Sequence, residues 1–459
     1  MNRRNLLKTL GIGAAGLTLG GVAWADENPS PPNILLIVSD DQGYGDTSGY
    51  WSTDVDTPVM DAVGANGVRF TQFRVNPLCA PTRASLFSGQ YSLECGMWRG
   101  PSQPGRGGNT QPRKIKEDVQ LLPQYLKQAG YATGMFGKWH LGYESPNVPN
   151  ERGFDEFVGF LGGAHPYKSS RQMLHNGESL QTDEHLTDLF TNRAIDFIRE
   201  HQTQPFFCYV PYNAVHGPLW RKDAPRPSGK TEWLQKYEKR GVDFPRRDYN
   251  AVLDHMDHSV GRILQTLKDL DLEENTLVIY LSDNGALTEK YPGDNGPLRG
   301  EKAQTYEGGI RVPAVMQWPG VIPKGLVSDA GAVHFDIFAT ILNAAGVPIP
   351  QTNGQHPVHG LSLLEHLKSA GQVDFPDRTL FWDLFGRMAA VSGPWKLVGT
   401  GANHRGRFAE AIPAIEELNF ELYRIDKDIG ENQNLADQHP EIYIKMKREF
   451  IHWFQLATQ

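Results

Sequence analysis

Four oxygen-bearing side chains, arranged in two adjacent pairs, could share one metal ion. Asp40 and Asp41 form the first pair, and Asp283 and Asn284 form the second. Two neighbouring carboxylates repel each other unless a cation lies between them. Carboxylate and amide oxygens, with no thiolate or imidazole, favour a hard cation such as Ca²⁺ or Mg²⁺ over Zn²⁺. A single pair of this kind more often belongs to a turn or a helix cap, so it is the match between the two pairs that favours a metal.

A cysteine followed by a proline and an arginine forms a second candidate group. The segment reads Cys79-Ala80-Pro81-Thr82-Arg83. Pro81 suits the first turn of a helix, so we expect Cys79 at or just before a helix N-terminus, where the helix dipole favours an anion. Arg83 follows one turn later and could bind a phosphate or sulfate group through two nitrogens. From its residue type alone, Cys79 is either a nucleophile or a structural buried thiol.

Two buried strands are expected to position the paired oxygen ligands. Residues 33–39 and 276–281 are continuous apolar runs, which are typical of strands buried on both faces of a parallel sheet. Each run leads directly into one of the two pairs. Ligands of open α/β sheets bind outside the carboxyl ends of the strands, so both runs indicate one site.

Strand and helix patterns alternate over most of the chain. Further strands are predicted at 131–136 and 206–212, and helices at 58–64, 121–129, 186–201 and 249–270. This alternation predicts the α/β class, with a large, mostly parallel sheet sandwiched by helices.

The pattern changes near residue 374. Short runs at 378–384, 388–392, 395–398 and 421–425 predict a smaller antiparallel sheet, and 441–456 predicts a closing helix. We therefore expect a catalytic domain over residues 26–373 and a C-terminal subdomain over residues 374–459. Residues 102–112 and 222–230 are rich in glycine, proline and charge, and we expect surface loops there.

The first 25 residues have the features of a twin-arginine export signal. Arg3 and Arg4 open the segment, an apolar run follows from Leu10 to Val22, and residues 23–25 form a cleavage site of the Ala-x-Ala type. The run is too short to span a bilayer comfortably. We therefore expect a bacterial protein in the periplasm or outside the cell, without stable membrane insertion.

Composition excludes several functional classes. The 459 residues carry a net charge of −8 and only three cysteines, which argues against a nucleic-acid-binding basic module and a small disulfide-stapled scaffold. Ten tryptophans argue against disorder. Cys95 and Cys208 could form a disulfide after export, but free buried thiols are at least as consistent with the sequence.

Several motifs, taken in order, resemble the type I sulfatases of the alkaline phosphatase superfamily. They are Cys79-x-Pro81-Thr82-Arg83 with Gly89, Gly130 to Gly142, Val215 to Pro218, Leu281 to Gly285, Arg299 to Lys302, Tyr306 to Pro313, and the short pieces at Glu421 to Tyr423, Gly430-Glu431 and Asn434-Leu435. The resemblance covers nearly the whole chain after residue 25, and it implies an alkaline-phosphatase-like fold and an arylsulfatase-like enzyme.

The resemblance also implies a modified residue and a metal ion. Cys79 would be converted to formylglycine by a formylglycine-generating enzyme before export, and the aldehyde would act as its hydrate. One Ca²⁺ ion, with Mg²⁺ as the less favoured choice, would be bound by five residues, which are Asp40, Asp41, Asp283, Asn284 and the modified Cys79. One hydroxyl of the hydrate would attack sulfur, and the second would later expel sulfate and restore the aldehyde.

Five further residues receive roles from the same resemblance. Arg83 and Lys138 would fix the hydrate and balance its charge, and His140 would hold or deprotonate its spare hydroxyl. His216 and Lys302 would contact the sulfate and protonate the leaving oxygen, which matters most for a poor alcohol leaving group. Outside the motifs, a lysine is by default a solvated surface charge and a histidine a satisfied, partly buried side chain.

Two alternative functions remain open from the sequence. One is a phosphodiester or phosphonate monoester hydrolase of the same superfamily, although Asn284 stands where a two-zinc phosphatase typically has histidine. The other is a non-catalytic protein that binds sulfated glycans. We expect an exo-acting sulfatase on a sulfated carbohydrate. Aromatic and cationic residues in loops could contact the sugar, and they are Trp98, Arg99, Tyr167, Arg171, Trp220 and Arg221.

Overall fold

The structure is a computed structural model that describes residues 31–102, 113–219, 228–401, 404 and 406–459. The expected export signal lies outside the described residues, as do most of the two expected surface loops. Residues Pro31–Gln459 group into one compact unit by their contacts.

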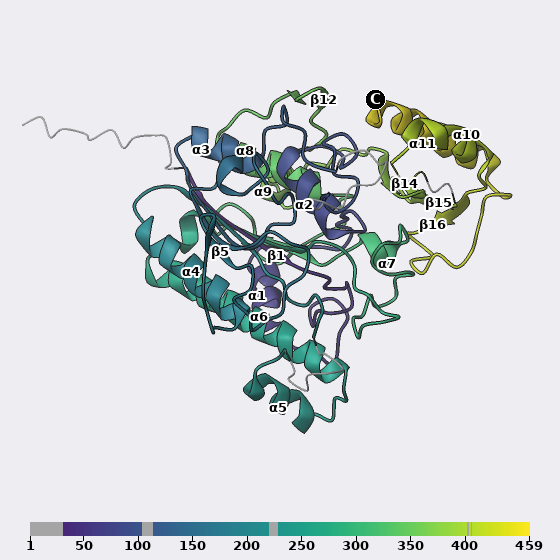
Figure 1. The fold of residues 1–459 in the computed structure, drawn as a ribbon. Coiled ribbons are helices and arrows are strands. Elements are labelled where there is room, and N and C mark those ends of the chain that lie inside the picture. Colours follow the sequence, from purple (N-terminus) through teal and green to yellow (C-terminus); the bar gives the residue numbers. More distant parts are fainter. Residues whose placement is uncertain (1–30, 103–112, 220–227, 402–403, 405) are drawn as a thin grey trace, which may run out of the picture. The chain divides into compact units, whose positions relative to one another are not determined.

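A large mixed sheet forms the centre of the fold (Figure 1). Its ten strands run in the order β10-β2-β9-β8-β1-β7-β3-β4-β5-β6. In chain order they are β1 (Asn33–Ser39), β2 (Val68–Phe70), β3 (Ala132–Lys138), β4 (Glu156–Phe160), β5 (Leu174–His175), β6 (Glu178–Ser179), β7 (Phe206–Pro211), β8 (Thr276–Ser282), β9 (Ala314–Gln317) and β10 (Leu326–Ser328). The central strands β8, β1, β7, β3 and β4 are mutually parallel. Strand β9 is antiparallel to both of its neighbours, β8 and β2, and β5 is antiparallel to β4.

The register of β1 and β8 sets the position of the paired oxygen ligands. All seven residues of each strand are buried, as expected for strands covered on both faces. Ser39 lies opposite Ser282 in the parallel ladder. The residues that follow, Asp40 and Asp283, therefore leave the sheet at the same edge.

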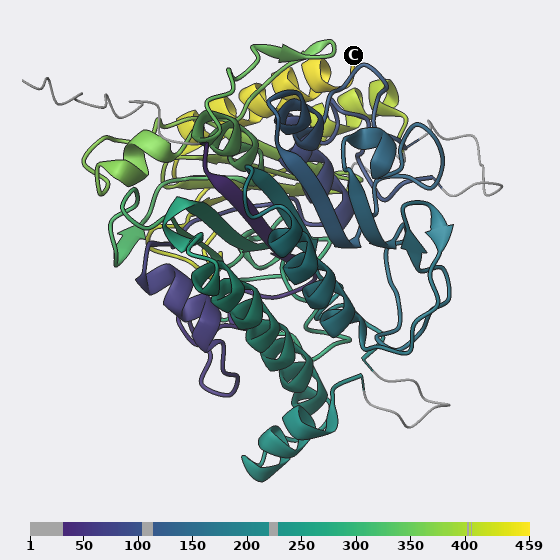
Figure 2. The ribbon, with the colours of Figure 1, turned by 90° about the vertical axis from the view of Figure 1, so that its left-hand side faces the viewer.

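Helices cover both faces of the sheet (Figures 1 and 2). One face packs against α2 (Cys79–Ser88), α3 (Leu122–Gln128), α8 (His334–Ala344) and α9 (Leu364–Lys368). The other packs against α1 (Pro58–Ala65), α4 (Leu186–Glu200) and α6 (Arg246–Asp269), and α5 (Thr231–Lys239) adds to α6. Short 3-10 helices lie at η1 (Asn150–Arg152) and η2 (Glu273–Asn275), and β11 (Thr352–Asn353) pairs with β12 (His356–Pro357).

A four-stranded antiparallel sheet with its own apolar cluster follows in the C-terminal part. It contains β13 (Leu380–Leu384), β14 (Arg387–Ser392), β15 (Trp395–Thr400) and β16 (Glu421–Arg424), with α10 (Phe408–Glu417) and α11 (Pro440–Ala457) packed on it. The expected small sheet and closing helix are confirmed. The domain boundary after residue 373 stays a prediction, and the first strand of the small sheet begins at Leu380.

A buried ion network joins α7 (Glu307–Ile310) and Arg74 to the small sheet. Glu307 of α7 pairs with Arg74 at 2.8 Å and with Lys396 of β15 at 2.9 Å. The same lysine pairs with Glu431 at 2.9 Å, and all four side chains are essentially inaccessible to solvent. Since an unpaired buried charge is costly, each member depends on the others.

The observed elements agree with the expected α/β class and extend it. The predicted strands and helices are all present, with ends displaced by a few residues; for example, the strand expected at 131–136 begins at Ala132 and continues to Lys138. No disulfide forms, because Cys95 and Cys208 are both free and belong to apolar clusters on opposite faces of the sheet.

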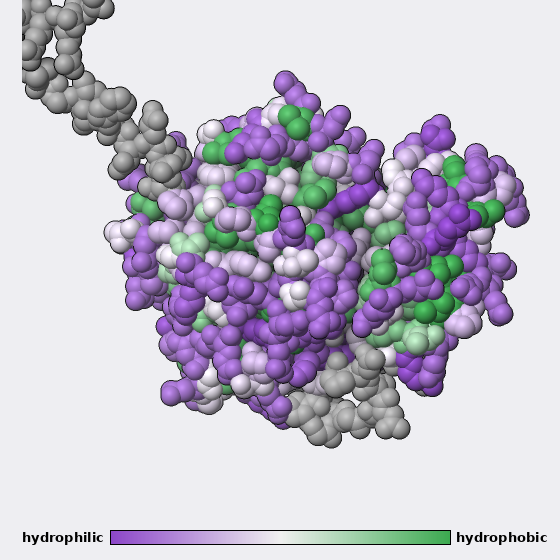
Figure 3. All heavy atoms as spheres, turned by 90° about the horizontal axis from the view of Figure 1, so that it is seen from above, coloured by the Kyte–Doolittle hydropathy of each residue, from purple (hydrophilic) through white to green (hydrophobic). Residues whose placement is uncertain are grey.

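One face of the molecule is mainly hydrophilic. Figure 3 shows hydrophilic side chains over most of this face, with apolar residues gathered in a few patches between them. Within the described residues, no helix combines the length and apolar character that crossing a membrane requires.

Candidate active site

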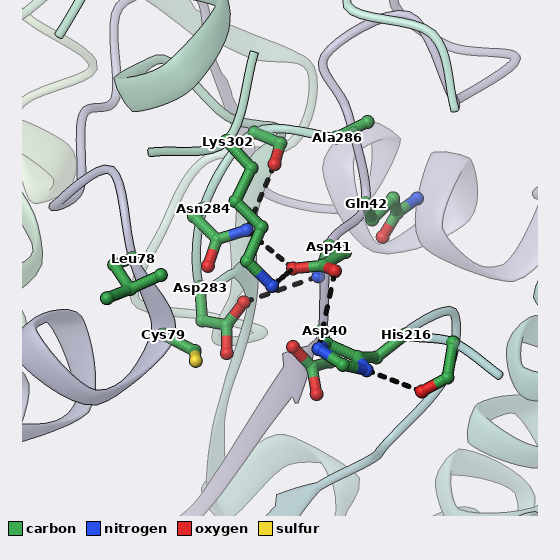
Figure 4. A network of polar contacts seen from close by, with 12 residues as sticks. Asp40, Asp41, Gln42, Leu78, Cys79, His216, Asp283, Asn284, Ala286 and Lys302 are labelled. Carbon is green, nitrogen blue, oxygen red and sulfur yellow. Dashed lines mark hydrogen bonds and ion pairs between the residues drawn. The ribbon is translucent and has the colours of Figure 1, made fainter. Parts of the chain in front are cut away.

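The two oxygen-bearing pairs meet at the carboxyl edge of the central sheet (Figure 4). The backbone N–H of Asp283 donates to Ser39 at 3.0 Å, and the N–H of Asp41 faces the Asp283 carboxylate at 3.3 Å. Asp41 has a φ of 63°, a left-handed conformation that aspartate tolerates better than most residues. This turn brings both members of the first pair toward the second strand end.

Three nitrogen donors surround the carboxylate of Asp41. Asn284 Nδ2 donates at 2.7 Å, Lys302 Nζ at 2.5 Å, and His216 Nε2 lies 3.7 Å away. Burial by itself raises the pKa of Asp41, but the charges of Lys302 and His216 outweigh burial and hold it well below its usual range. Asp41 is therefore ionised at neutral pH.

Two buried acceptor atoms in this group have no hydrogen-bond donor among the described residues. They are Asp40 Oδ1 and Asn284 Oδ1. The second oxygen of Asp40 accepts from Lys138 Nζ at 2.6 Å. Buried acceptors are normally satisfied, so two oxygens without donors in this group are compatible with a bound cation.

The donor set fits a hard metal ion. Ligand atoms of Asp40, Asp283 and Cys79 all lie within 4.8 Å of one another, and so do those of Asp40, Asp41 and His216. Calcium takes about six to eight oxygen ligands from carboxylates, amides and water. The four predicted oxygen-bearing residues are brought together and supply this chemistry.

Cys79 is the first residue of α2, as its sequence predicted. All ten residues of this helix are buried, so its N-terminal N–H groups lie inside the protein next to the carboxylates. Cys79 Sγ lies 3.3 Å from His140 Nδ1. Burial raises the pKa of the Cys79 thiol. An unmodified thiol at this position would stay protonated and would be a poor nucleophile.

Arg83 uses its guanidinium on a neighbouring carboxylate. Its Nε and Nη2 donate to Asp283 Oδ2 at 3.0 and 2.7 Å, and Nη1 donates to the Lys138 carbonyl at 2.9 Å. These contacts differ from the expectation that Arg83 itself grips a phosphate or sulfate group through two nitrogens. Burial and the adjacent Asp40 raise the pKa of Asp283 to about 6, in spite of the arginine.

His140 lies in a narrow space between two backbone segments. A Cβ atom placed on Gly163 would lie 2.7 Å from the imidazole ring, and one on Gly100 would lie 3.3 Å from it. Burial, followed by the charges of Lys138 and Arg83, holds the pKa of His140 well below its usual range. The imidazole is therefore uncharged at neutral pH.

His216 and Lys302 face Asp41 from two loops. His216 Nδ1 donates to the Gly217 carbonyl at 2.6 Å, which turns Nε2 toward Asp41. Lys302 precedes Ala303, whose N–H donates to Pro77 at 2.7 Å and so ties this loop to the start of α2. All six predicted catalytic residues thus lie around one point.

The expected sugar-contacting residues are not all available. Trp98 and Tyr167 are 4% and 2% exposed, and Tyr167 Oη donates to the carbonyls of Asn213 and His216. Both aromatics are therefore packing residues, which corrects the expectation. Arg99 and Arg171 are exposed. Trp220 and Arg221 lie outside the described residues.

One buried residue that shapes the turn after Asp40 and Asp41 was not predicted. Asp46 accepts hydrogen bonds from the N–H of Gly43 at 3.0 Å, from Tyr249 Oη at 2.5 Å and from Arg246 Nη1 at 2.6 Å. Tyr249 Oη also reaches the Asp41 carbonyl at 3.3 Å. The sequence places Asp46 in the glycine-containing turn after Asp40 and Asp41. No pattern near Asp46 in the sequence indicates its two partners on α6, Arg246 and Tyr249.

Comparisons with known proteins give consistent matches. A family model described as Sulfatase matches residues 32–347. The N-acetylgalactosamine-6-sulfatase of Canis lupus familiaris is 35% identical over 398 residues, covering 81% of this chain and 70% of the relative. A protein named Sulfatase from Formosa agariphila is 30% identical, covering 92% and 88%. The crystal structure of Ps i-CgsB in complex with k-i-k-neocarrahexaose superposes with a TM-score of 0.81 at 27% identity, over 94% of each chain.

Proposed function

Because the chain belongs to the sulfatase family, whose members hydrolyse sulfuric esters, we propose that it removes sulfate from a sulfated carbohydrate. We further propose exo action, at the end of a sugar chain, with simple aryl sulfates as artificial substrates. Two relatives support a sugar substrate through their names, one an N-acetylgalactosamine-6-sulfatase and the other solved with k-i-k-neocarrahexaose.

The observation that carries the proposal is the pair of orphaned oxygens beside Cys79. Asp40 Oδ1 and Asn284 Oδ1 are buried acceptors without donors in the described chain. We assign them, with Asp41, Asp283 and the modified Cys79, to one Ca²⁺ ion, and Mg²⁺ is the second choice. A cation bound there would stabilise negative charge on the sulfuryl oxygens and lower the pKa of an attacking hydroxyl.

Conversion of Cys79 to formylglycine would supply the nucleophile as a hydrated aldehyde. The buried thiol itself is unsuited to attack, because its pKa is raised. The position at the N-terminus of α2 suits an anionic group.

The surrounding side chains would orient the nucleophile and move its protons. His140 Nδ1 lies 3.3 Å from Cys79 Sγ, and its neutral imidazole would take a proton from the hydroxyl in that place. Lys138 holds Asp40, and Arg83 holds Asp283, so the two cations fix the carboxylates. Their charge would also balance the hydrate.

His216 and Lys302 would act on the substrate side. Both direct nitrogen atoms at Asp41, and both are partly exposed, with side-chain exposures of 22% and 10%. Burial opposes the charge of Lys302, but Asp41 outweighs it and raises the pKa of the ammonium group, which stays protonated. The two residues would hold sulfate oxygens and protonate the leaving alcohol.

Export and maturation belong to the same proposal. A twin-arginine signal would carry the folded protein to the periplasm or the cell exterior, after a formylglycine-generating enzyme has modified Cys79. Loss of the three cationic residues Arg3, Arg4 and Lys8 with the signal would change the net charge from −8 to −11.

A screen for released sulfate tests the function. The purified protein, loaded with Ca²⁺, is incubated with an aryl sulfate and with sulfated mono- and oligosaccharides. We expect sulfate release from the aryl ester and from at least one sugar. Release from aryl esters alone would refute the carbohydrate assignment, and binding of sulfated sugars without any release would favour a non-catalytic glycan-binding protein.

A further inference from the structure

Three arginines without acidic partners lie on backbone segments next to the site. They are Arg99, Arg113 and Arg387. Arg99 and Arg387 are exposed, and none of the three forms an ion pair with a carboxylate among the described residues. The neighbouring segment 103–112, whose structure is not described, contains no Asp or Glu in its sequence. Among the described residues, these three guanidinium groups therefore lack a paired carboxylate, in a protein whose net charge is negative.

Arg99 and Arg113 are connected to His140 through Gly100. Arg99 directly precedes Gly100, and Arg113 Nε donates to the Gly100 carbonyl at 2.8 Å. Gly100 in turn lies against the His140 ring. The guanidinium of Arg113 lies over the ring of Trp98, the residue before Arg99, at 5.5 Å, and burial and the charge of Arg99 both lower the pKa of Arg113.

Arg387 is connected to Lys302 in the same manner. Arg387 Nη1 donates to the carbonyl of Ala303, the residue after Lys302, at 2.5 Å. Thr305 in the same loop donates to the Met388 carbonyl at 3.2 Å. The turn between β13 and β14 is therefore docked on the loop that carries a predicted sulfate-binding lysine.

Phe385 links the segment that carries Arg99 to the turn that carries Arg387. The guanidinium of Arg99 stacks over the Phe385 ring at 4.7 Å, and this ring contacts Trp98 edge-on at 5.8 Å. Phe385 has a φ of 58°, an uncommon conformation for a bulky residue. The turn thus holds an aromatic ring under Arg99 and places Arg387 two residues further along.

From this arrangement we propose that Arg99, Arg113 and Arg387 form an anion-binding subsite for a second acidic group of the substrate. The inference rests on the proposed function, and it specifies the substrate class as a sulfated sugar joined to a second anionic sugar. Guanidinium groups bind carboxylates and sulfates through paired N–H donors, so a uronate carboxylate and a second sulfate are both suitable. A neutral neighbouring sugar would leave the arginines uncompensated.

Three disaccharides with the same sulfated non-reducing sugar separate these possibilities. The second sugar is neutral in the first, a uronate in the second and a sulfated sugar in the third, and kcat/KM for sulfate release is measured for each. We expect the wild-type protein to prefer one or both dianionic substrates by at least about tenfold over the neutral one. The dianionic substrate with the higher value identifies the acidic group. Equal values for all three would overturn the inference.

Variants then assign the preference to Arg99 and Arg387, the two exposed arginines of the three. In Arg99→Gln and Arg387→Gln, we expect the ratio of kcat/KM for the preferred dianionic substrate to that for the neutral substrate to fall about tenfold, mainly through KM. The control is Arg448→Gln, because Arg448 is exposed on α11. It should keep the wild-type ratio. An unchanged ratio in both Arg99→Gln and Arg387→Gln would overturn the inference.

An aryl sulfate separates failure of this inference from failure of the function. If the wild-type protein releases sulfate from the aryl ester and shows no preference among the disaccharides, only the subsite is wrong. If it releases no sulfate from any ester, the proposed function is wrong, and the subsite with it.

Discussion

His140 Nδ1 lies 3.3 Å from Cys79 Sγ, although the two residues come from different segments of the chain. Cys79 begins a helix that is buried along its whole length, and His140 follows the end of β3 with a φ of 60°. The pair places a neutral imidazole directly beside the proposed nucleophile, and the first prediction follows from it.

Replacing His140 with Ala should reduce turnover more than binding. The imidazole would act on the hydroxyl of the hydrate, so kcat for an aryl sulfate should fall by about 10² to 10⁴, with a smaller change in KM. His258→Ala, on the exposed side of α6, is the matched control and should retain wild-type kinetics. A kcat equal to wild type in His140→Ala would remove His140 from the mechanism.

Removing the metal should lower both activity and thermal stability. Without a cation, the carboxylates of Asp40, Asp41 and Asp283 lie close together in a buried site, so binding of Ca²⁺ should raise Tm. A chelator should abolish sulfate release, and Ca²⁺ should restore it better than Mg²⁺.

Asp40→Asn tests the same ion without reference to activity. The substitution keeps the side-chain volume but removes the charge of the carboxylate that carries one of the two orphaned oxygens. We expect differential scanning fluorimetry to show a Ca²⁺-dependent rise in Tm for the wild-type protein and a much smaller one for the variant. An equal rise in both would place the ion elsewhere.

Acid should destabilise the fold partly through His334. Burial lowers the pKa of His334 to about 3, and the neutral ring lies between the Asn76 side chain and the Arg74 carbonyl. An unfolded histidine has a pKa near its ordinary value of 6.5, so between pH 6.5 and pH 3 the unfolded state binds a proton that the folded state does not. The contribution of the neutral His334 to the free energy of unfolding is therefore complete above pH 6.5. It falls as the pH drops toward 3, and the loss is about 2 kcal/mol at pH 5.

Urea unfolding at pH 7.5 and pH 5 measures this loss. His334→Gln should be less stable than wild type at pH 7.5, but its stability should decline less between the two pH values. A decline as steep as that of the wild-type protein would show that His334 does not contribute.

The buried ion network should be essential for stability. Lys396→Met would leave Glu307 and Glu431 facing each other without their shared cation, so the free energy of unfolding should fall by about 3 to 5 kcal/mol. Lys427→Met, at an exposed position in the same part of the chain, should have little effect. Denaturant titrations of the two variants make the comparison, and equal small effects would contradict the assigned role of the network.

The strand ends were predictable because their signal is local. Seven buried residues precede Asp40, and a similar run precedes Asp283, so apolar runs and polar ends together indicated one site. The helix start at Cys79 followed from Pro81 in the same way. These features depend on neighbouring residues in the chain.

Other features depend on packing between distant segments, which a single sequence does not reveal. Trp98 and Tyr167 were expected at the substrate, yet each is enclosed by residues far away in sequence. The partners of Asp46 on α6 were not predicted for the same reason. The contact of Arg387 with Ala303 joins the small sheet to the loop that carries Lys302, over a sequence separation of 84 residues, and no local pattern indicates it.

The mass of the peptide that contains Cys79 tests the central claim most directly. The protein is purified from its native host, digested without alkylation and analysed by mass spectrometry, with the Cys95 and Cys208 peptides as unmodified internal references. The formylglycine account predicts a Cys79 peptide about 18 Da lighter than the sequence mass, because sulfur is lost and an aldehyde is gained. A Cys79 peptide that still carries a thiol, shown by uptake of an alkylating reagent added after digestion, would contradict it.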